Sequence, residues 1–176
     1  CRAKASVHDS TASISSPVKN QIRNRPFYPA LVEIITVNAN LTELTNALKQ
    51  TLPSAELEIS HLPGLPNMRL ALINSDFSTG PLPEQVMRNV IAKPAYWAFC
   101  WGSGLALAQW LTNNPSVLAG KRVADIGSGS GVVAVAAKQA GAAQVWACDN
   151  DDQALLASKT NGQLNKAEIQ LCADIE

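Results

Sequence analysis

The second half of the chain has the clearest pattern of apolar and polar positions. Short apolar runs of strand length alternate there with longer stretches in which apolar residues recur every three or four positions. The strand-like runs cover residues 122–126, 144–149 and 168–173, and the helical stretches cover residues 103–112, 132–139 and 152–165. This β-α-β-α-β order predicts an α/β, Rossmann-like fold: the first half of a doubly wound parallel sheet that binds its ligand at the carboxyl ends of the strands.

The first half of the chain predicts a smaller unit. Residues 31–37 are a β-branched run of strand length, and after Asn40, a helix-cap residue type, residues 41–48 repeat apolar positions at helical spacing. Residues 55–60 alternate apolar and polar side chains as a half-exposed strand does, and residues 68–73 form a further apolar strand. We therefore expect a β-α-β unit before the main domain.

These patterns divide the chain into three parts. Residues 1–30 hold five Lys or Arg against one acid and read as a flexible tail. Residues 31–92 contain the β-α-β unit and a linker, and residues 93–176 contain the main α/β domain, which we expect to be incomplete at its carboxyl end.

Composition excludes several classes of function. The 14 basic and 14 acidic residues balance, so the net charge favours neither nucleic acid nor a membrane surface as partner. No apolar run approaches the roughly 20 residues that cross a bilayer. The four cysteines form no CxxC pair, which predicts a reducing compartment and no metal site. We expect a cytoplasmic protein, and the basic tail leaves the mitochondrial matrix as the alternative.

The candidate chemistry centres on the turn between the first strand and helix of the main domain, where Gly127, Gly129 and Gly131 alternate with Ser128 and Ser130. Glycines there let the main chain turn sharply and bring the amide groups of the helix start close to a ligand. The GxGxxG motif of dinucleotide sites has its third glycine one position later, and the absence of a basic residue over 123–137 excludes a Walker-type phosphate loop.

Acidic residues complete this candidate site. Asp125 precedes the turn, which suits a ligand with a positive centre, although the residue pattern leaves a purely structural role in the loop equally open. Asp149 ends the second strand, where a carboxylate accepts hydrogen bonds from ribose hydroxyls, and Asp174 ends the third, where it can accept from an adenine amino group. S-adenosylmethionine carries a positive centre, ribose hydroxyls and an adenine amino group, so it fits all three acidic residues.

These residues resemble a known family. The run over 123–131, with Cys-Asp-Asn-Asp over 148–151, resembles motifs I and II of class I S-adenosylmethionine-dependent methyltransferases. The upstream run over 94–104, Pro-Ala-Tyr-Trp-Ala-Phe-Cys-Trp-Gly-Ser-Gly, is similar to the lysine methyltransferases of the electron-transfer-flavoprotein β subunit and their bacterial relatives. Ser103 departs from a glycine common in that group. The unit over residues 31–60 is similar in character to the recruiting domain of ribosomal-protein lysine methyltransferases.

The resemblance implies a role for several residues. It places Trp101 beside the cofactor, the segment from Gly127 through Ser128 to Gly129 at its methionine end, Asp149 at its ribose, and Asp174 with Ile175 at its adenine. It also implies methyl transfer from S-adenosylmethionine to a lysine of a protein substrate, which is the electron-transfer flavoprotein β subunit or a ribosomal protein. The resemblance covers roughly residues 68–176 and three of seven expected strands, so we expect the catalytic residues beyond Glu176 and assign none.

Two alternatives from other classes remain open at this point. A nicotinamide-dependent oxidoreductase could be built on the same half-fold, although the position of Gly131 counts against it. A truncated, non-catalytic module that only binds the cofactor is the other alternative, because a sheet that stops after its third strand leaves an unpaired edge.

Overall fold

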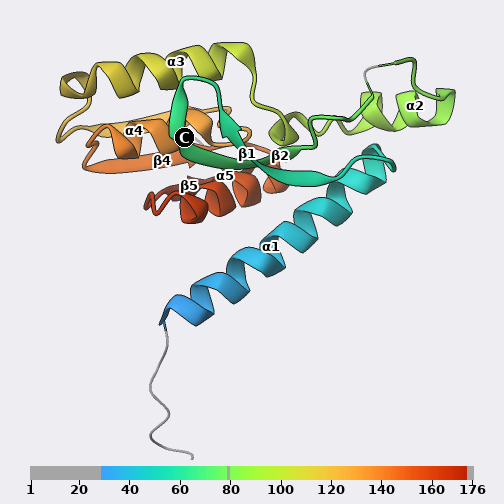
Figure 1. The fold of residues 1–176 in the computed structure, drawn as a ribbon, viewed down its shortest axis with the longest axis horizontal. Helices are drawn as coiled ribbons and strands as arrows, with labels where there is room; N and C mark the ends of the chain where they lie inside the picture. The colour runs from blue at the N-terminus through green and yellow to red at the C-terminus, as the bar shows by residue number, and fades with distance from the viewer. Residues whose placement is uncertain (1–28, 79, 174–176) are drawn as a thin grey trace, which may run out of the picture.

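The computed structural model describes residues 29–78 and 80–173 (Figure 1). Its helices and strands are, in chain order, α1 (Pro29–Thr51), β1 (Leu57–Leu62), β2 (Leu65–Ile73), α2 (Glu84–Ala92), α3 (Gly102–Asn113), β3 (Arg122–Ile126), α4 (Val132–Gln139), β4 (Gln144–Cys148), α5 (Asp152–Leu164) and β5 (Gln170–Cys172). Single 3-10 turns, η2 (Tyr96–Ala98) and η3 (Pro115–Val117), flank α3. The tail expected over residues 1–30 lies outside the described residues except for Pro29 and Ala30, which begin α1.

The main domain has the predicted parallel sheet. Strands β3, β4 and β5 lie side by side in that order, and both neighbouring pairs are parallel. Ile126 of β3 pairs with Cys148 of β4, which pairs in turn with Cys172 of β5. Because parallel strands end at the same edge, the segments that follow β3, β4 and β5 meet there. The Rossmann-like part of the prediction is confirmed.

Helix α4 packs tightly against the sheet and is flanked by α3 and α5. Its alanines Ala134, Ala136 and Ala137 are fully buried, and side chains this small let the helix approach β3 and β4 closely. On β3, Val123 packs against this core, whereas Ile126 is 69% exposed. One face of the sheet therefore carries the described helices, and the alternate positions of β3 face away from them.

The prediction of a strand over residues 31–37 is wrong, because these residues lie in the 23-residue helix α1. Asn40 is likewise a residue of the helix interior and not its cap. Proline suits the first position of a helix, and Pro29 stands there. Thr36 and Thr45 each donate a hydroxyl hydrogen bond of 2.8 Å to the carbonyl four residues earlier, so these β-branched residues satisfy their polar groups within the helix.

The N-terminal unit is consequently α-β-β and not β-α-β. Strands β1 and β2 form an antiparallel hairpin whose tight turn includes Gly64, with a φ of 72°. Buried hairpin residues such as Met68 and Leu70 share one core with Ala108 of α3 and Val135 of α4. The hairpin thus packs directly on the helix layer of the main domain.

Two asparagines at the carboxyl end of α5, Asn161 within the helix and Asn165 at its C-cap, attach the hairpin to the main domain. The fully buried Asn161 accepts a hydrogen bond from the backbone N–H of Ala71 at 2.7 Å and donates one to the carbonyl of Ser130 at 2.8 Å. Asn165 accepts from the backbone N–H of Arg69 at 3.0 Å and donates to the carbonyl of the same residue. Asn161 therefore connects the hairpin to the loop that follows β3.

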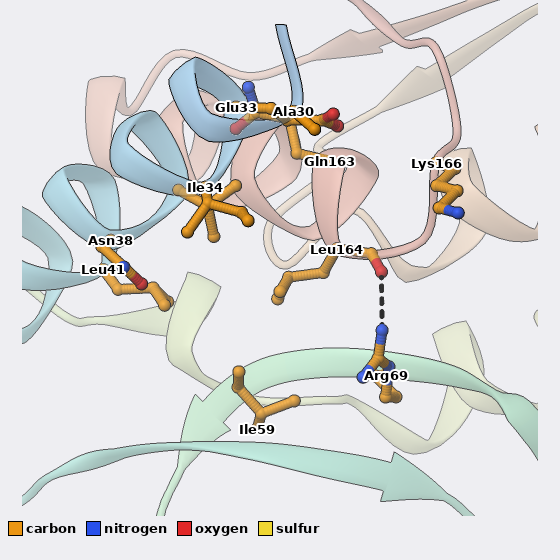
Figure 2. Close-up of a pocket in the computed structure, with 11 residues that line it drawn as sticks. Ala30, Glu33, Ile34, Asn38, Leu41, Ile59, Arg69, Gln163, Leu164 and Lys166 are labelled. Carbon is orange, nitrogen blue, oxygen red and sulfur yellow. Dashed lines mark hydrogen bonds between the residues drawn. The ribbon is translucent and has the colours of Figure 1, made fainter. Parts of the chain in front are cut away.

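The first half of α1 leaves the body of the molecule, as Figure 1 shows. Its residues Leu31, Val32, Ile34 and Ile35 are each between 51% and 59% exposed. A cavity of about 460 Å³ lies between this half of α1, the hairpin and the end of α5 (Figure 2). Across it, the guanidinium of Arg69 donates a 3.3 Å hydrogen bond to the carbonyl of Leu164 (Figure 2). The glycine loop after β3 does not line this cavity.

Candidate functional site

The loop between β3 and α4 folds over the end of β4. Gly127, Gly129 and Gly131 have φ values of 72°, 50° and 75°, in the left-handed region that glycine adopts at little cost. The backbone N–H groups of Gly127 and Ser128 both donate to the carbonyl of Cys148, at 2.8 and 3.1 Å. The loop is thus a hydrogen-bonded turn whose position depends on the end of the neighbouring strand β4.

The three glycines have different surroundings. A Cβ added to Gly127 or Gly129 would meet no atom within 4 Å, whereas one added to Gly131 would lie 2.8 Å from both the Cα and the Oγ of Ser158. The Ser158 hydroxyl also donates to the Oγ of Ser128 at 3.1 Å, and Ser128 is buried. Gly127 and Gly129 therefore border open space, while Gly131 and Ser128 hold the loop against α5.

The carboxylate of Asp149 lies beside this open space. Its Oδ2 accepts a hydrogen bond from the N–H of Gly129 at 2.9 Å, and its Oδ1 accepts from the N–H of Asp151 at 3.1 Å. The backbone N–H of Asp149 donates to the carbonyl of Cys172 at 3.1 Å. A carboxylate has about four acceptor positions, so both oxygens of this fixed group retain capacity for a ligand.

These groups line one cavity of about 460 Å³. Four of the predicted site residues, Trp101, Gly127, Gly129 and Asp149, line it together. The indole N–H of Trp101 donates to the carbonyl of Tyr96 at 3.0 Å, and the two rings meet edge to face with centroids 5.8 Å apart. Trp101 is 52% exposed, so its ring forms a fixed wall with a free surface.

Asp125 contacts the start of α4 and does not contact the cavity. Its Oδ2 accepts a 3.0 Å hydrogen bond from the backbone N–H of Ala134 in the first turn of α4, and it does not line the cavity. Burial raises the pKa of Asp125, the hydrogen bond from Ala134 lowers it, and the charge of Asp149 raises it. The structure shows the stabilising contact, and a role of Asp125 toward a ligand stays a prediction.

The other predicted residues divide into two groups. Ser128 and Gly131 belong to the loop but do not line the cavity, and Asp174 and Ile175 lie outside the described residues. Sequence reasoning missed several lining residues, namely Ala92, Lys93, Pro94, Tyr96, Trp97, Asn150, Asp151 and Ala154. The aromatic ones lie in the run over 94–104 that carried the family resemblance. Asp151 caps α5 through a 2.9 Å hydrogen bond from the N–H of Gln153, and no spacing signals Lys93.

The described residues contain neither a candidate metal site nor a candidate membrane span. Within residues 29–78 and 80–173, no group of three or more His, Cys, Asp or Glu side chains could hold a metal ion. Over the same ranges no helix is both long and apolar enough to span a bilayer.

Comparisons with known proteins give a consistent result. Residues 105–175 match the family model described as Ribosomal protein L11 methyltransferase (PrmA). The chain is 50% identical over 70 residues to the Danio rerio Electron transfer flavoprotein beta subunit lysine methyltransferase, a match that covers 40% of this chain and 27% of the relative. It is 43% identical over 93 residues to a Vibrio cholerae Ribosomal protein L11 methyltransferase, a match that covers 51% of this chain and 30% of the relative.

The family-model match includes the glycine loop and Asp149, whereas Trp101 precedes it. A crystal structure of ribosomal protein L11 methylase from Lactobacillus delbrueckii subsp. bulgaricus shares 34% identity, with a TM-score of 0.38, over 43% of this chain and 39% of that one. The chain spans less than a third of the length of the curated relatives described above. The predicted resemblance is confirmed: the chain is similar to the electron-transfer-flavoprotein β-subunit and ribosomal-protein methyltransferases, and its residues 105–175 match a methyltransferase family.

Proposed function

We propose that this chain binds S-adenosylmethionine for methyl transfer to the side-chain amine of a lysine in a protein substrate. One observation carries the proposal: the carboxylate of Asp149, with each oxygen held by one backbone N–H, faces the same cavity as the unobstructed glycines Gly127 and Gly129. The names of the matched relatives specify lysine or a ribosomal protein as the acceptor, which supports the second half of the proposal.

The residues present fit this cofactor. Gly127 and Gly129 leave free the volume that a Cβ would fill, so a ligand can approach their main chain. Asp149 retains acceptor positions for two ribose hydroxyls, and Trp101 offers an aromatic surface at the cavity. Asp149 and Asp151 outnumber the one basic residue of the lining, Lys93, so the cavity carries net negative charge, which suits a ligand with ammonium and sulfonium centres.

When bound, S-adenosylmethionine supplies a methyl group on a positively charged sulfur. The contribution of this chain is to bind and orient: Asp149 would accept hydrogen bonds from the ribose hydroxyls, and the ring of Trp101 would exclude water from one side. A lysine ammonium has an ordinary pKa of about 10.4 and must lose a proton before its nitrogen can attack. We assign no residue of the described ranges to that proton transfer.

The oxidoreductase alternative is not favoured, because the family model and the relatives described above are methyltransferases. The two functions predict different ligands for the same loop. Isothermal titration calorimetry of the chain with S-adenosylmethionine and, separately, with NADH distinguishes them. Binding of the methyl donor without binding of NADH supports the proposal, and the reverse result refutes it.

A pair of variants tests the site itself. Asp149→Asn removes the charge while keeping the shape, and hydrogen bonds to a charged group contribute about 1.5–3 kcal/mol, so donor affinity should fall about 10- to 100-fold. Asp152→Asn is the matched control, since Asp152 is an exposed carboxylate in the first turn of α5 that does not line the cavity. Equal affinities for Asp149→Asn and wild type would remove the basis of the assignment.

A further inference from the structure

Two cysteines lie opposite each other at the carboxyl ends of β4 and β5. Cys148 and Cys172 are partners in the parallel register, so their side chains project from the same face of the sheet. Their thiols are in hydrogen-bond contact. Cys148 is buried and Cys172 is half-buried. Cys100, which is half-buried as well, lies before α3 and outside this pair.

The main chain of this pair supports the proposed donor site. The carbonyl of Cys148 accepts hydrogen bonds from the N–H groups of Gly127 and Ser128, and the carbonyl of Cys172 accepts from the N–H of Asp149. The peptide groups of the two cysteines therefore position both the glycine loop and Asp149. A change in the distance between these strand ends moves both parts of the site.

We propose that Cys148 and Cys172 are a site of reversible oxidation, in which a peroxide converts the two thiols to a disulfide and thereby lowers the affinity of the chain for its methyl donor. Neighbouring strands lie about 4.8 Å apart, within the range of roughly 4.4–6.8 Å between Cα atoms that a disulfide allows. The effect on the donor rests on the function proposed above, whereas formation of the disulfide does not.

The chemistry balances in two steps. The peroxide oxidises the half-exposed thiol of Cys172 to a sulfenic acid and releases one water. The sulfur of Cys148 then attacks that sulfur, so that the S–S bond forms, the S–O bond breaks, and a second water leaves. The dithiol loses two electrons and two protons, and a thiol reductant reverses the change. Burial and the contact with Cys172 raise the pKa of Cys148, which accords with oxidation beginning at Cys172.

The expected size of the effect follows from the geometry. A disulfide needs its Cβ atoms about 3.8 Å apart, so strand ends spaced by about 4.8 Å must shift by up to about 1 Å. A displacement of about this size breaks a hydrogen bond between the donor and the charged carboxylate of Asp149, and the loss of one such bond lowers the affinity by about tenfold or more. We expect the oxidised chain to bind S-adenosylmethionine about tenfold more weakly than the reduced chain.

Peptide mapping tests the disulfide directly. The full chain is treated with hydrogen peroxide, blocked with an alkylating reagent, digested with trypsin without reductant, and analysed by mass spectrometry. The peptide over residues 139–159, which contains Cys148, should appear joined to the peptide that begins at Ala167 and contains Cys172. The linked species should persist in Cys100→Ser and vanish in Cys172→Ser. Absence of this linkage in the wild type, or preferential linkage of Cys148 to Cys100, overturns the proposal.

Donor titration of the same samples tests the consequence. The reduced wild type should bind S-adenosylmethionine, the oxidised wild type about tenfold more weakly, and dithiothreitol should restore the affinity. Peroxide should not change the affinity of Cys172→Ser. A reduced chain that binds no donor refutes the proposed function and leaves the mapping result intact. An oxidised chain with the mapped linkage and unchanged affinity refutes the link between oxidation and donor binding.

Discussion

Replacement of Gly131 by alanine tests whether the loop after β3 is held by contact with α5. The added Cβ would lie 2.8 Å from the Cα of Ser158, a backbone atom that cannot move without shifting the helix. Gly131 also has a φ of 75°, where a side chain costs about 1–2 kcal/mol. Overpacking of a tight contact adds about 1–3 kcal/mol, so we expect Gly131→Ala to lower the free energy of unfolding by about 2–5 kcal/mol.

The matched control is Gly129→Ala, two residues earlier in the same loop. Its φ of 50° brings a similar conformational cost, but its Cβ would meet no atom within 4 Å. The loss of unfolding free energy should therefore be only about 1–2 kcal/mol. Its Cβ would instead enter the cavity beside Asp149, so donor affinity should fall by at least about tenfold although the chain remains folded.

Urea denaturation followed by far-UV circular dichroism measures both variants. If the slope of the unfolding free energy against urea concentration is unchanged, the shift of the midpoint reports the loss of stability directly. The expected order is wild type, then Gly129→Ala, then Gly131→Ala. Equal destabilisation by the two substitutions would show that contact with Ser158 does not position the loop. Unchanged donor affinity of Gly129→Ala would show that the ligand does not approach this part of the main chain.

Three further predictions follow from single contacts. Asn161→Ala leaves the N–H of Ala71 and the carbonyl of Ser130 without their partner, so calorimetric or urea unfolding should show a loss of about 2–6 kcal/mol. Burial raises the pKa of Asp125 above its ordinary 3.8, so the folded chain holds this proton more tightly than the unfolded chain. Stability should then fall as the pH rises from the ordinary carboxyl pKa through the raised one, and urea unfolding over a pH series should show a smaller fall for Asp125→Asn. Trp101→Ala should weaken donor binding in titration calorimetry by about two- to tenfold, with a stability loss of about 1 kcal/mol or less; unchanged affinity would exclude the ring as a wall of the site.

The main domain could be predicted from sequence because its signals are local. Glycine-rich turns separate short apolar runs from helical stretches, and β3, α4, β4 and α5 begin at the expected residues. The glycine loop and the acid at the end of β4 follow from the same pattern. Gly127, Gly129 and Asp149 are for this reason both predicted and found beside one cavity.

Helix α1 was predicted incorrectly because a short β-branched run was given more weight than a longer repeat of apolar residues at helical spacing. The β-branched residues over 31–37 favour a strand, yet Ile34, Val37, Leu41, Leu44 and Leu48 recur at intervals of three and four. This helical repeat continues into the buried half of α1, where Leu44 and Leu48 lie in the core. Reading the repeat backward from Leu48 would have identified the helix.

Other features depend on contacts between distant segments, which a single sequence does not contain. The hydrogen bond between Asn161 and Ala71 joins residues 90 positions apart. The same holds for Lys93 at the cavity of Asp149 and for the register that brings Cys148 opposite Cys172. The types of these residues do not reveal their neighbours, which only the packing of α5, the hairpin and the sheet assigns.

In the proposed complex, the methyl donor binds between the glycine loop and Asp149. Titration of the ¹⁵N-labelled chain with S-adenosylmethionine, observed in amide correlation spectra, tests it most directly. We expect shifts at the amides of Gly127, Gly129 and Asp149 and at the indole N–H of Trp101, with none at Ile59 or Arg69 beside α1. Shifts confined to the cavity beside α1, or an unchanged spectrum at saturating donor, would contradict it.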